Sequence, residues 1–359
     1  FSHQSKLDSA TSSTKEILKN AKDLLKEMYK DGMFIRLVGV RVDGLVEKEE
    51  LQLSLFGNTE ENKKQQFLDT GITCIFKDKK AVTKEDFKDI DIVFGNPDLN
   101  MIKDTPVQWI QLDSAGANAY CSLPDSIVLT NAKGAYNEAI SEHMLACTLA
   151  VYKNLFAYEK VAQKHEWTNL GSVPTISQLK VLSIGMGNIG SAYAKLMHTL
   201  GAKVYGLTRT KHELPDYLED LYTFEQLDEV LADKDVIALS LPETEQTKHL
   251  FNYERLHQIK QGAMIINVGR GSAIVTKDLV RIMKEKHLRA ACLDVTEYEP
   301  LPKNMDLWNV ENVYITPHIS GRFNAQANYD NVIHIFHKNL LHFINKEPLE
   351  NIVDKKQGY

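Results

Sequence analysis

Residues 180–190 of the chain have the sequence KVLSIGMGNIG, an apolar run followed by the pattern Gly-x-Gly-x-x-Gly. A helical pattern closed by Gly201 comes directly after it. Such glycines permit a tight turn and a close approach of the backbone to a pyrophosphate, and the helix N-terminus offers unpaired N–H groups to the anion. The pattern alone is weak, but between a strand and a helix it predicts a dinucleotide-binding loop. Its candidate cofactor residues are Gly185, Gly187, Asn188, Ile189 and Gly190.

The strand expected after this helix bears on the choice of cofactor. An Asp or Glu about 20 residues after the glycines would bind the ribose 2′-hydroxyl of NAD. The chain instead has Thr208, Arg209 and Lys211 there, and these side chains could hold a 2′-phosphate through charge-assisted hydrogen bonds. The sequence therefore favours NADP(H). In the alternative, Arg209 stacks on the adenine and NAD(H) binds as well.

Short apolar runs separated by helical patterns continue on both sides of the glycine loop. This alternation is typical of βαβ units and a parallel sheet. Since the runs are too many for one small sheet, we expect an α/β protein with two α/β units. The candidate strands are residues 72–76, 91–95, 107–112, 180–185, 202–207, 236–241, 263–268, 290–295 and 312–317.

Length and composition limit the classes of protein. The chain has 359 residues, enough for about two domains, and 43% hydrophobic with 25% charged residues is the balance of a globular protein. The net charge of -6 offers no basic stripe for direct nucleic-acid binding. The 4 cysteines are far apart, which predicts no zinc or other metal site and favours a reducing cytoplasm. No signal peptide or membrane span is expected.

Three further segments lie where predicted strands end, which is where open α/β sheets bind ligands. They are NVGRG at 267–271, LDVTEYEP at 293–300 and TPHISG at 316–321. Hydride transfer to or from a 2-keto acid needs a cation for the carboxylate, a proton carrier that works near neutral pH, and a carboxylate beside that carrier. Arg270, His318 and Glu299 supply these three parts. Each could instead be an ordinary surface residue, but their conjunction in this order makes chance improbable.

With these motifs the chain, from about residue 70 to Tyr359, resembles the D-isomer-specific 2-hydroxyacid dehydrogenase family. The resemblance implies that Arg270 binds the substrate, that His318 is the general acid/base, and that Glu299 hydrogen-bonds His318. It implies that the loop of Ser114, Ala115 and Gly116 grips the substrate carboxylate. Further cofactor contacts implied by the family are Ser240, Leu241, Pro242, Thr247, Val268, Gly269, Asp294, His318 and Gly321. A formate dehydrogenase of similar fold is disfavoured because of Glu299.

The family also implies the domain plan and the reaction. A Rossmann cofactor domain at 172–318 would be inserted in a flavodoxin-like substrate domain made of 70–171 and 319–359. The expected enzyme is an NAD(P)-dependent oxidoreductase that interconverts a small 2-keto acid and a D-2-hydroxy acid. A homodimer formed through the cofactor domain is expected.

The first 57 residues resemble a different family, the little-finger domain at the C-terminal end of Y-family translesion DNA polymerases of the polymerase IV type. The likeness lies in a helix predicted at 13–29, a strand at 34–42 and the pentapeptide QLSLF at 52–56, and it predicts an α+β fragment. Residues 58–69 are expected to be a linker. In QLSLF, the side chains of Gln52, Leu53, Leu55 and Phe56 resemble a sliding-clamp-binding motif. An amphipathic edge strand is the alternative. Polymerase activity is not expected, because the palm and its metal-binding carboxylates are missing.

This N-terminal fragment occupies the place of the dehydrogenase family's usual first strand. The chain opens at Phe1, as though it began inside the polymerase-like fragment. A gene fusion, a gene-prediction artefact and an engineered join remain open, and the strand at 34–42 is a candidate for the vacant position. A second hypothesis for function follows, namely a clamp-binding fusion protein whose dehydrogenase half is impaired.

Overall fold

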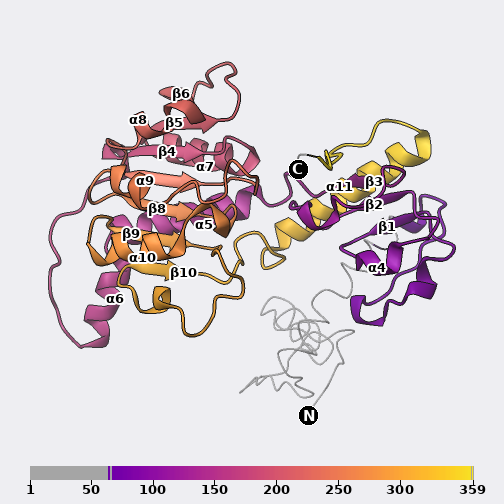
Figure 1. Cartoon of the computed structure of the whole chain (residues 1–359), viewed down its shortest axis with the longest axis horizontal. Helices are drawn as coiled ribbons and strands as arrows, with labels where there is room; N and C mark the ends of the chain where they lie inside the picture. Colours follow the sequence, from indigo (N-terminus) through magenta and orange to yellow (C-terminus); the bar gives the residue numbers. More distant parts are fainter. Residues whose placement is uncertain (1–63, 65–66, 357, 359) are drawn as a thin grey trace, which may run out of the picture. The chain divides into compact units, whose positions relative to one another are not determined.

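The structure, a computed structural model, describes residues 64, 67–356 and 358 (Figure 1). The chain divides into two compact units, residues 1–76 and 77–359. The helix predicted at 13–29, the strand at 34–42 and the pentapeptide at 52–56 lie outside the described residues. The fold is therefore described for the second unit.

A parallel sheet of seven strands forms the larger part of this unit, in the order β10-β9-β8-β7-β4-β5-β6. The chain runs outward from the central pair β4 and β7 in both directions, so the strand order reverses beside the glycine loop that follows β4. Ligands bind at such a reversal in open α/β sheets. The strands are β4 (Lys180–Ile184), β5 (Lys203–Thr208), β6 (Asp220–Thr223), β7 (Val236–Leu239), β8 (Met264–Asn267), β9 (Ala290–Leu293) and β10 (Val313–Ile315).

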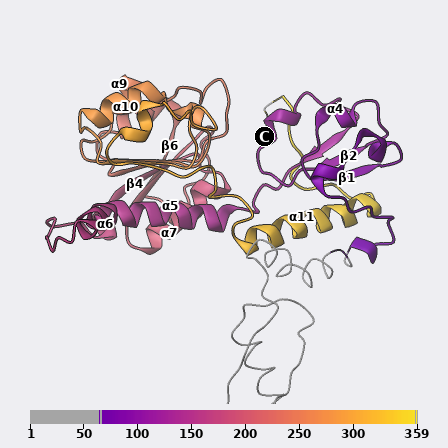
Figure 2. The same ribbon diagram turned by 90° about the horizontal axis from the view of Figure 1, so that it is seen from below.

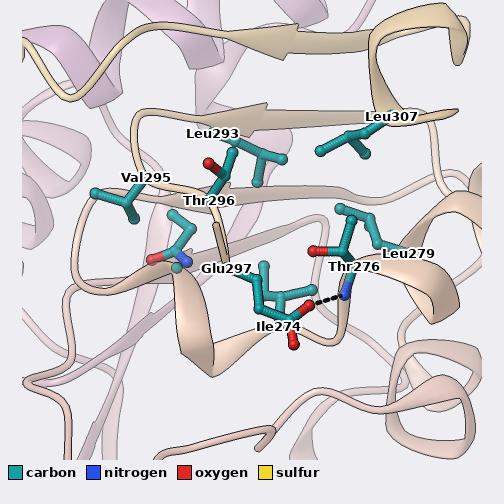
Figure 3. A pocket seen from close by; sticks show the side chains of 10 residues that line it. Ile274, Thr276, Leu279, Leu293, Val295, Thr296, Glu297 and Leu307 are labelled. Carbon is teal, nitrogen blue, oxygen red and sulfur yellow. Dashed lines mark hydrogen bonds between the residues drawn. The ribbon is translucent and has the colours of Figure 1, made fainter. Parts of the chain in front are cut away.

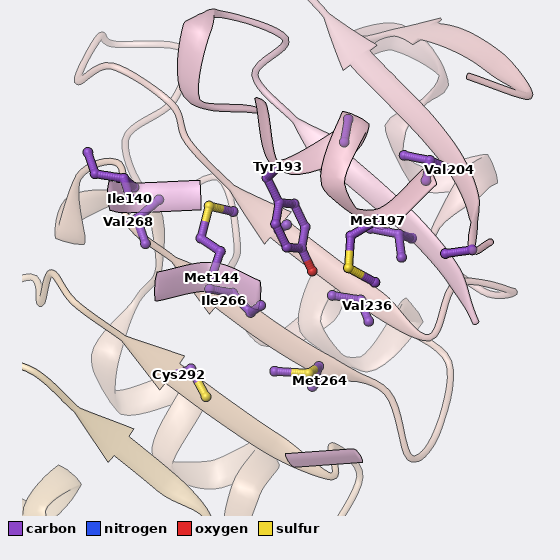
Figure 4. Packing of buried hydrophobic residues seen from close by; sticks show 14 of the residues in the cluster. Ile140, Met144, Tyr193, Met197, Val204, Val236, Met264, Ile266, Val268 and Cys292 are labelled. Carbon is purple, nitrogen blue, oxygen red and sulfur yellow. The ribbon is translucent and has the colours of Figure 1, made fainter. Parts of the chain in front are cut away.

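Successive residues of each central strand point into two different cores. In β4, Val181 belongs to the core beneath α5 (Asn137–Tyr152) and α7 (Asn188–Thr199), whereas Leu182 belongs to the opposite core. Figure 2 shows α5 and α7 on one face of the sheet and α9 and α10 on the other. Because both faces are covered, the central strands are mainly apolar. Figure 4 shows the first core, with Tyr193 and Met197 of α7 packed on the strands.

A second parallel sheet of three strands, β1 (Ile92–Phe94), β2 (Trp109–Gln111) and β3 (Val128–Thr130), precedes the first in sequence. The C-terminal helix α11 (Gln326–Asn345) returns to this sheet: Phe336 stacks on Phe94 at 4.3 Å between ring centroids, and Phe343 stacks on Trp109 at 5.3 Å. The fold is thus a Rossmann-like α/β domain within a smaller α/β domain, as the sequence predicts.

The remaining helices are mostly short. They are α4 (Leu99–Ile102), α6 (Leu155–Gln163), α8 (Leu227–Val230), α9 (Tyr253–Gln258) and α10 (Thr276–Lys284), with 3-10 turns η1 (Lys79–Ala81), η2 (Lys84–Phe87), η3 (Asn118–Tyr120), η4 (Ile176–Gln178), η5 (Phe224–Gln226), η6 (Gly271–Ala273) and η7 (Asp306–Asn309). Helix α5 falls within the range predicted for the substrate domain, 70–171, yet it packs on α7 and β8 of the larger sheet.

One predicted strand is wrong and two strands were not predicted. Residues 72–78 have no regular structure, and Ile75 and Phe76 are exposed, because no described strand pairs with this run. The strands β3 and β6 were missed. Strand β6 contains Asp220 and has only four residues, so its apolar signal is weak.

Candidate functional site

The glycine loop connects β4 to α7 and each glycine has its own geometry. Gly185 has a φ of 96°, a left-handed conformation that favours glycine. A Cβ on Gly190 would lie 2.1 Å from the carbonyl oxygen of Gly185, so only glycine fits there. A Cβ on Gly187 would meet no atom within 4 Å. The open space at Gly187, the N-cap residue of α7 without a side-chain cap, suits the pyrophosphate of a dinucleotide.

The loop after β7 packs directly on the glycine loop. The Ser240 hydroxyl donates to the carbonyl of Gly185 at 2.8 Å. A Cβ on Gly269 would lie 2.5 Å from the backbone nitrogen of Leu241, so the loop after β8 packs against this one. The hydroxyl of Thr247 is engaged inside its own loop, since it donates to the carbonyl of Pro242 at 2.7 Å. The predicted segments 240–242 and 268–269 are therefore brought together at the C-terminal edge of the sheet.

The end of β5 carries the residues on which the cofactor choice depends. Thr208 is the last residue of the strand and is partly buried, whereas Arg209 and Lys211 are exposed. The neighbouring strand β6 pairs Thr223 with Thr208.

Arg270 lies against the loop predicted to grip the substrate carboxylate. A Cβ on Gly116 would lie 2.2 Å from Nη2 of Arg270, so the guanidinium contacts the bare backbone of that loop. The backbone of Arg270 is held by Asn267, whose Nδ2 donates to its carbonyl at 3.0 Å. A guanidinium beside free backbone amides is a suitable receptor for a carboxylate. Among the described residues, the amides of Ala115 and Gly116 donate no hydrogen bond to another backbone group.

His318 and Glu299 form a hydrogen-bonded pair, with Nδ1 of His318 at 2.8 Å from Oε2 of Glu299. The two side chains are 42% and 39% exposed, so the imidazole can reach a ligand. His318 has a φ of 52°, and its amide donates to the carbonyls of Asp294 and Thr316. A carboxylate on Nδ1 fixes the ring orientation and leaves Nε2 for the reacting atom.

Asp294 anchors the segment that carries His318. Its carboxylate is buried and accepts hydrogen bonds from the Thr316 hydroxyl at 2.6 Å, from the Ile319 amide at 3.0 Å, and from both the amide and the hydroxyl of Ser320. Burial alone would raise the pKa of Asp294, but these hydrogen bonds outweigh it and lower the pKa. The oxygens of Asp294, which was predicted to contact the cofactor, thus accept hydrogen bonds from the protein itself.

A pocket of about 130 Å³ joins the glycine loop to the substrate loop. Sequence reasoning missed half of its wall, the segment between β3 and α5, because β3 itself was not predicted. Gly321, another predicted cofactor residue, lies beside this segment and α5, since its Cβ would be 3.7 Å from Cβ of Tyr136 and 2.8 Å from Cδ1 of Ile140. The pocket is lined by Ala115, Lys133, Gly134, Tyr136, Asn137, Ile140, Gly187, Asn188, Ile189 and Ser240.

A second cavity lies below the loop after β8 and is drawn in Figure 3. Its volume is about 10 Å³, room for one water at most and too small for a cofactor. Glu297 on its wall accepts from the amide of Thr276 at 2.9 Å and so caps α10. Burial would raise the pKa of Glu297, but this bond and the one from His249 lower it. The cavity is a structural feature of the α10 cap.

Three findings concern other kinds of site. Within residues 67–356, no three His, Cys, Asp or Glu side chains gather as a metal site would require. No helix in the described part of the chain is both long and apolar enough to cross a membrane. The four cysteines are unpaired thiols.

Known proteins agree with this geometry. Residues 145–320 match the model of the D-isomer specific 2-hydroxyacid dehydrogenase NAD binding domain. Glyoxylate/hydroxypyruvate reductase B of Erwinia tasmaniensis is 30% identical over 232 residues, covering 63% of this chain and 70% of that protein. The crystal structure of an NADPH-dependent glyoxylate/hydroxypyruvate reductase from Sinorhizobium meliloti, solved with NADP and sulfate, has a TM-score of 0.70 at 28% identity, covering 76% of this chain and 88% of that one. A D-isomer specific 2-hydroxyacid dehydrogenase family protein from Aeromonas salmonicida reaches 0.74 at 28% identity, covering 82% and 96%.

The fold and the site therefore define a nicotinamide-dependent dehydrogenase. The chain belongs to the D-isomer-specific 2-hydroxyacid dehydrogenase family. It is an NAD(P)-dependent oxidoreductase that transfers a hydride between the cofactor and a 2-keto or 2-hydroxy acid. Residues 1–55 separately match the impB/mucB/samB family C-terminal domain, which confirms the predicted polymerase-like fragment.

Proposed function

We propose that the chain reduces a small 2-keto acid of the glyoxylate and hydroxypyruvate class, with NADPH preferred over NADH. The contact of the Arg270 guanidinium with Gly116 carries the proposal, because it forms a carboxylate receptor next to the cofactor loop. The names of the two reductases described above support this substrate class.

The proposed roles follow from the geometry. When bound, the cofactor supplies a hydride to the keto carbon. Arg270 and the amides of the loop 114–116 hold the carboxylate and orient the carbonyl. His318, protonated and hydrogen-bonded to Glu299 through Nδ1, donates its Nε2 proton to the carbonyl oxygen as that oxygen gains charge. The keto acid, one hydride and one proton thus give the 2-hydroxy acid.

The proposed cofactor site consists of the glycine loop, the segments 240–242 and 268–269, and the end of β5. Thr208, Arg209 and Lys211 are proposed to hold the 2′-phosphate, and the NADP complex of the Sinorhizobium meliloti protein supports that preference. We propose the domain ranges 172–318 for the cofactor domain and 70–171 with 319–359 for the substrate domain, except that α5 and α6 pack on the larger sheet and belong with the cofactor domain. The contacts of α11 with the three-stranded sheet support the return of the C-terminal segment.

The function is tested with purified full-length protein. NADPH oxidation at 340 nm is measured with glyoxylate, hydroxypyruvate, pyruvate and a branched 2-keto acid, and the Michaelis constants for NADPH and NADH are compared in wild type and Arg209→Ala. We expect turnover with the two small acids, and a loss of the NADPH preference in the variant. NADH preferred by both proteins would refute the phosphate contact, and a flat trace with every acid would refute the activity.

We further propose a homodimer formed through the cofactor domain. Helix α6 and the segment after it extend outside the packed layers of the larger sheet in Figure 1. They expose Leu155 at 54%, Trp167 at 104% and Leu170 at 37%. Apolar side chains that are exposed together support an interface with a second copy.

The pentapeptide 52–56 is proposed to bind a sliding clamp, as its likeness to clamp-binding motifs suggests. A pull-down with the clamp, with Leu55→Ala and Phe56→Ala together as the control, tests this. Clamp binding together with absent NADPH oxidation would favour the fusion protein with an impaired dehydrogenase half. Turnover would remove that alternative. A cytoplasmic location stays a prediction that the four unpaired thiols favour.

A further inference from the structure

The pocket of about 130 Å³ contains one charged side chain, that of Lys133. Its other lining residues are neutral, and none is a carboxylate. Lys133 is exposed, and its ammonium has no hydrogen-bond or ion-pair partner within the described part of the chain. A single unpaired cation in a pocket without acids favours an anionic ligand.

The backbone of Lys133 is fixed on both sides. Its amide donates to Oδ1 of Asn131 at 3.1 Å, and its carbonyl accepts from Nδ2 of Asn351 at 2.9 Å. The same Asn131 donates through Nδ2 to the carbonyl of Ala115 at 2.8 Å. The lysine therefore projects from a loop that is tied to the substrate loop, and little conformational freedom of the backbone is lost on binding.

The opposite wall of the pocket is the glycine loop. A Cβ on Gly134 would lie 3.3 Å from Nδ2 of Asn188, so the loop of Lys133 touches the first residue of α7. Gly187 and Asn188 line the same pocket. The first turn of α7 is where a dinucleotide places its pyrophosphate, the most highly charged part of NADH and a strongly charged part of NADPH.

We propose that Lys133 is a further cofactor-binding residue, whose ammonium pairs with the pyrophosphate from the side opposite to the glycine loop. This inference rests on the proposed cofactor site and adds a contact from outside the Rossmann sheet. The pyrophosphate then lies between the α7 N-terminus and a lysine on the loop that holds Ala115. Binding of the cofactor thereby stabilises the loop that receives the substrate carboxylate.

The test measures dissociation constants directly, by calorimetry, for NADPH and for 2′-phospho-ADP-ribose, which has the pyrophosphate but no nicotinamide. For Lys133→Met we expect both constants to rise about tenfold at low salt, and the difference from wild type to shrink at 0.5 M KCl. Lys133→Arg should restore most of the affinity. Lys203→Met, which removes an exposed lysine at the start of β5, on the edge of the sheet opposite the glycine loop, is the matched control and should bind as wild type does.

Three results would overturn the inference while leaving the proposed function intact. The two constants could be unchanged in Lys133→Met while the Michaelis constant for the keto acid rises, which would make the lysine a substrate contact. NADPH alone could bind more weakly, which would place the contact at the nicotinamide half. Finally, both dissociation constants and the Michaelis constant for the keto acid could be the same in Lys133→Met as in wild type. Failure of wild type to bind NADPH would instead refute the proposed function, and with it this contact.

Discussion

The imidazole of His318 and the carboxylate of Glu299 are joined by a hydrogen bond of 2.8 Å from Nδ1 to Oε2, across 19 residues of sequence. The two residues reach each other because β9 and β10 are adjacent parallel strands whose C-terminal ends meet at one edge of the sheet. The pair points one nitrogen of the ring at a carboxylate and leaves the other free. This arrangement suits the proposed role of His318 as a proton carrier.

Replacing His318 with Gln should lower kcat by about 10²- to 10⁴-fold, because the proton donor is lost, while NADPH binding persists. Glu299→Gln keeps a hydrogen-bond acceptor but removes the charge, so a smaller loss of kcat is expected. Arg270→Ala should also nearly abolish turnover. Steady-state kinetics with fluorescence titration of NADPH separates these effects, and unchanged kcat in His318→Gln or Arg270→Ala would contradict the assignment.

Substitutions at two positions of the glycine loop should separate an effect on protein stability from an effect on NADPH binding. Gly190→Ala places a Cβ 2.1 Å from the carbonyl oxygen of Gly185, so the loop must move and the melting temperature should fall by several degrees. Gly187→Ala meets no protein atom, so its melting temperature should be that of wild type while NADPH binds more weakly. Thermal unfolding with and without NADPH checks both. Equal melting behaviour of the two variants would be inconsistent with this geometry.

Asp294→Asn should cost about 2–4 kcal/mol of stability at pH 7, since the amide cannot accept all the hydrogen bonds of the carboxylate. The folded-state pKa lies below the ordinary value of 3.8. The contribution of the ionised group is therefore fully present above that pH and is lost as pH falls through the lowered pKa. Urea unfolding of both proteins should show a constant difference from pH 5 to 8 that narrows below pH 4.

Asp306→Asn is the matched control for this variant. Its side chain is 73% exposed and lies 3.4 Å from Lys284. A surface pair of this kind contributes little, so the substitution should change stability by less than about 0.5 kcal/mol. A loss in Asp306→Asn as large as that in Asp294→Asn would show that the hydrogen bonds of Asp294 are not the cause.

Trp167→Ser should weaken the proposed homodimer, because it removes the most exposed aromatic side chain of the arm formed by α6 and the segment after it. Sedimentation velocity at several protein concentrations should then show a larger monomer fraction than in wild type. Trp308→Ser removes a half-exposed tryptophan outside this arm, whose Nε1 donates to the carbonyl of Pro302 at 3.0 Å, and should leave the association unchanged. If both variants dimerise like wild type, the interface lies elsewhere.

Most strands of the larger sheet could be predicted because a doubly covered parallel strand is apolar throughout, as in β7 (Val236–Leu239). The run ITCIF at 72–76 is also largely apolar and yet is no strand, since pairing depends on a neighbouring strand that composition does not specify. Strand β3 (Val128–Thr130) was missed, although it is as long as β1 and β2, which were predicted. Because this strand was not predicted, Lys133 and Asn137 were not recognised as candidate site residues, although ligands bind beyond the C-terminal ends of parallel strands.

The sequence predicted which residues belong to the candidate site better than it predicted the hydrogen bonds that these residues make. Arg270, Glu299 and His318 stand in motifs, so their positions followed from the sequence. The four bonds to Asp294 did not, because two of them come from backbone amides whose positions depend on the turn around His318. Likewise, no sequence pattern shows that Thr247 donates its hydroxyl inside its own loop.

The contact between Gly116 and Arg270 limits how this enzyme can be redesigned. Any side chain at position 116 would displace the guanidinium, since even a methyl group would lie 2.2 Å from Nη2. A library aimed at bulkier acids should therefore keep position 116 fixed and vary η3 and the loop after β1, whose Asn96 accepts from the amide of Asp113 at 3.3 Å. Selection there can enlarge the space for the substrate's variable end while the proposed carboxylate receptor stays intact.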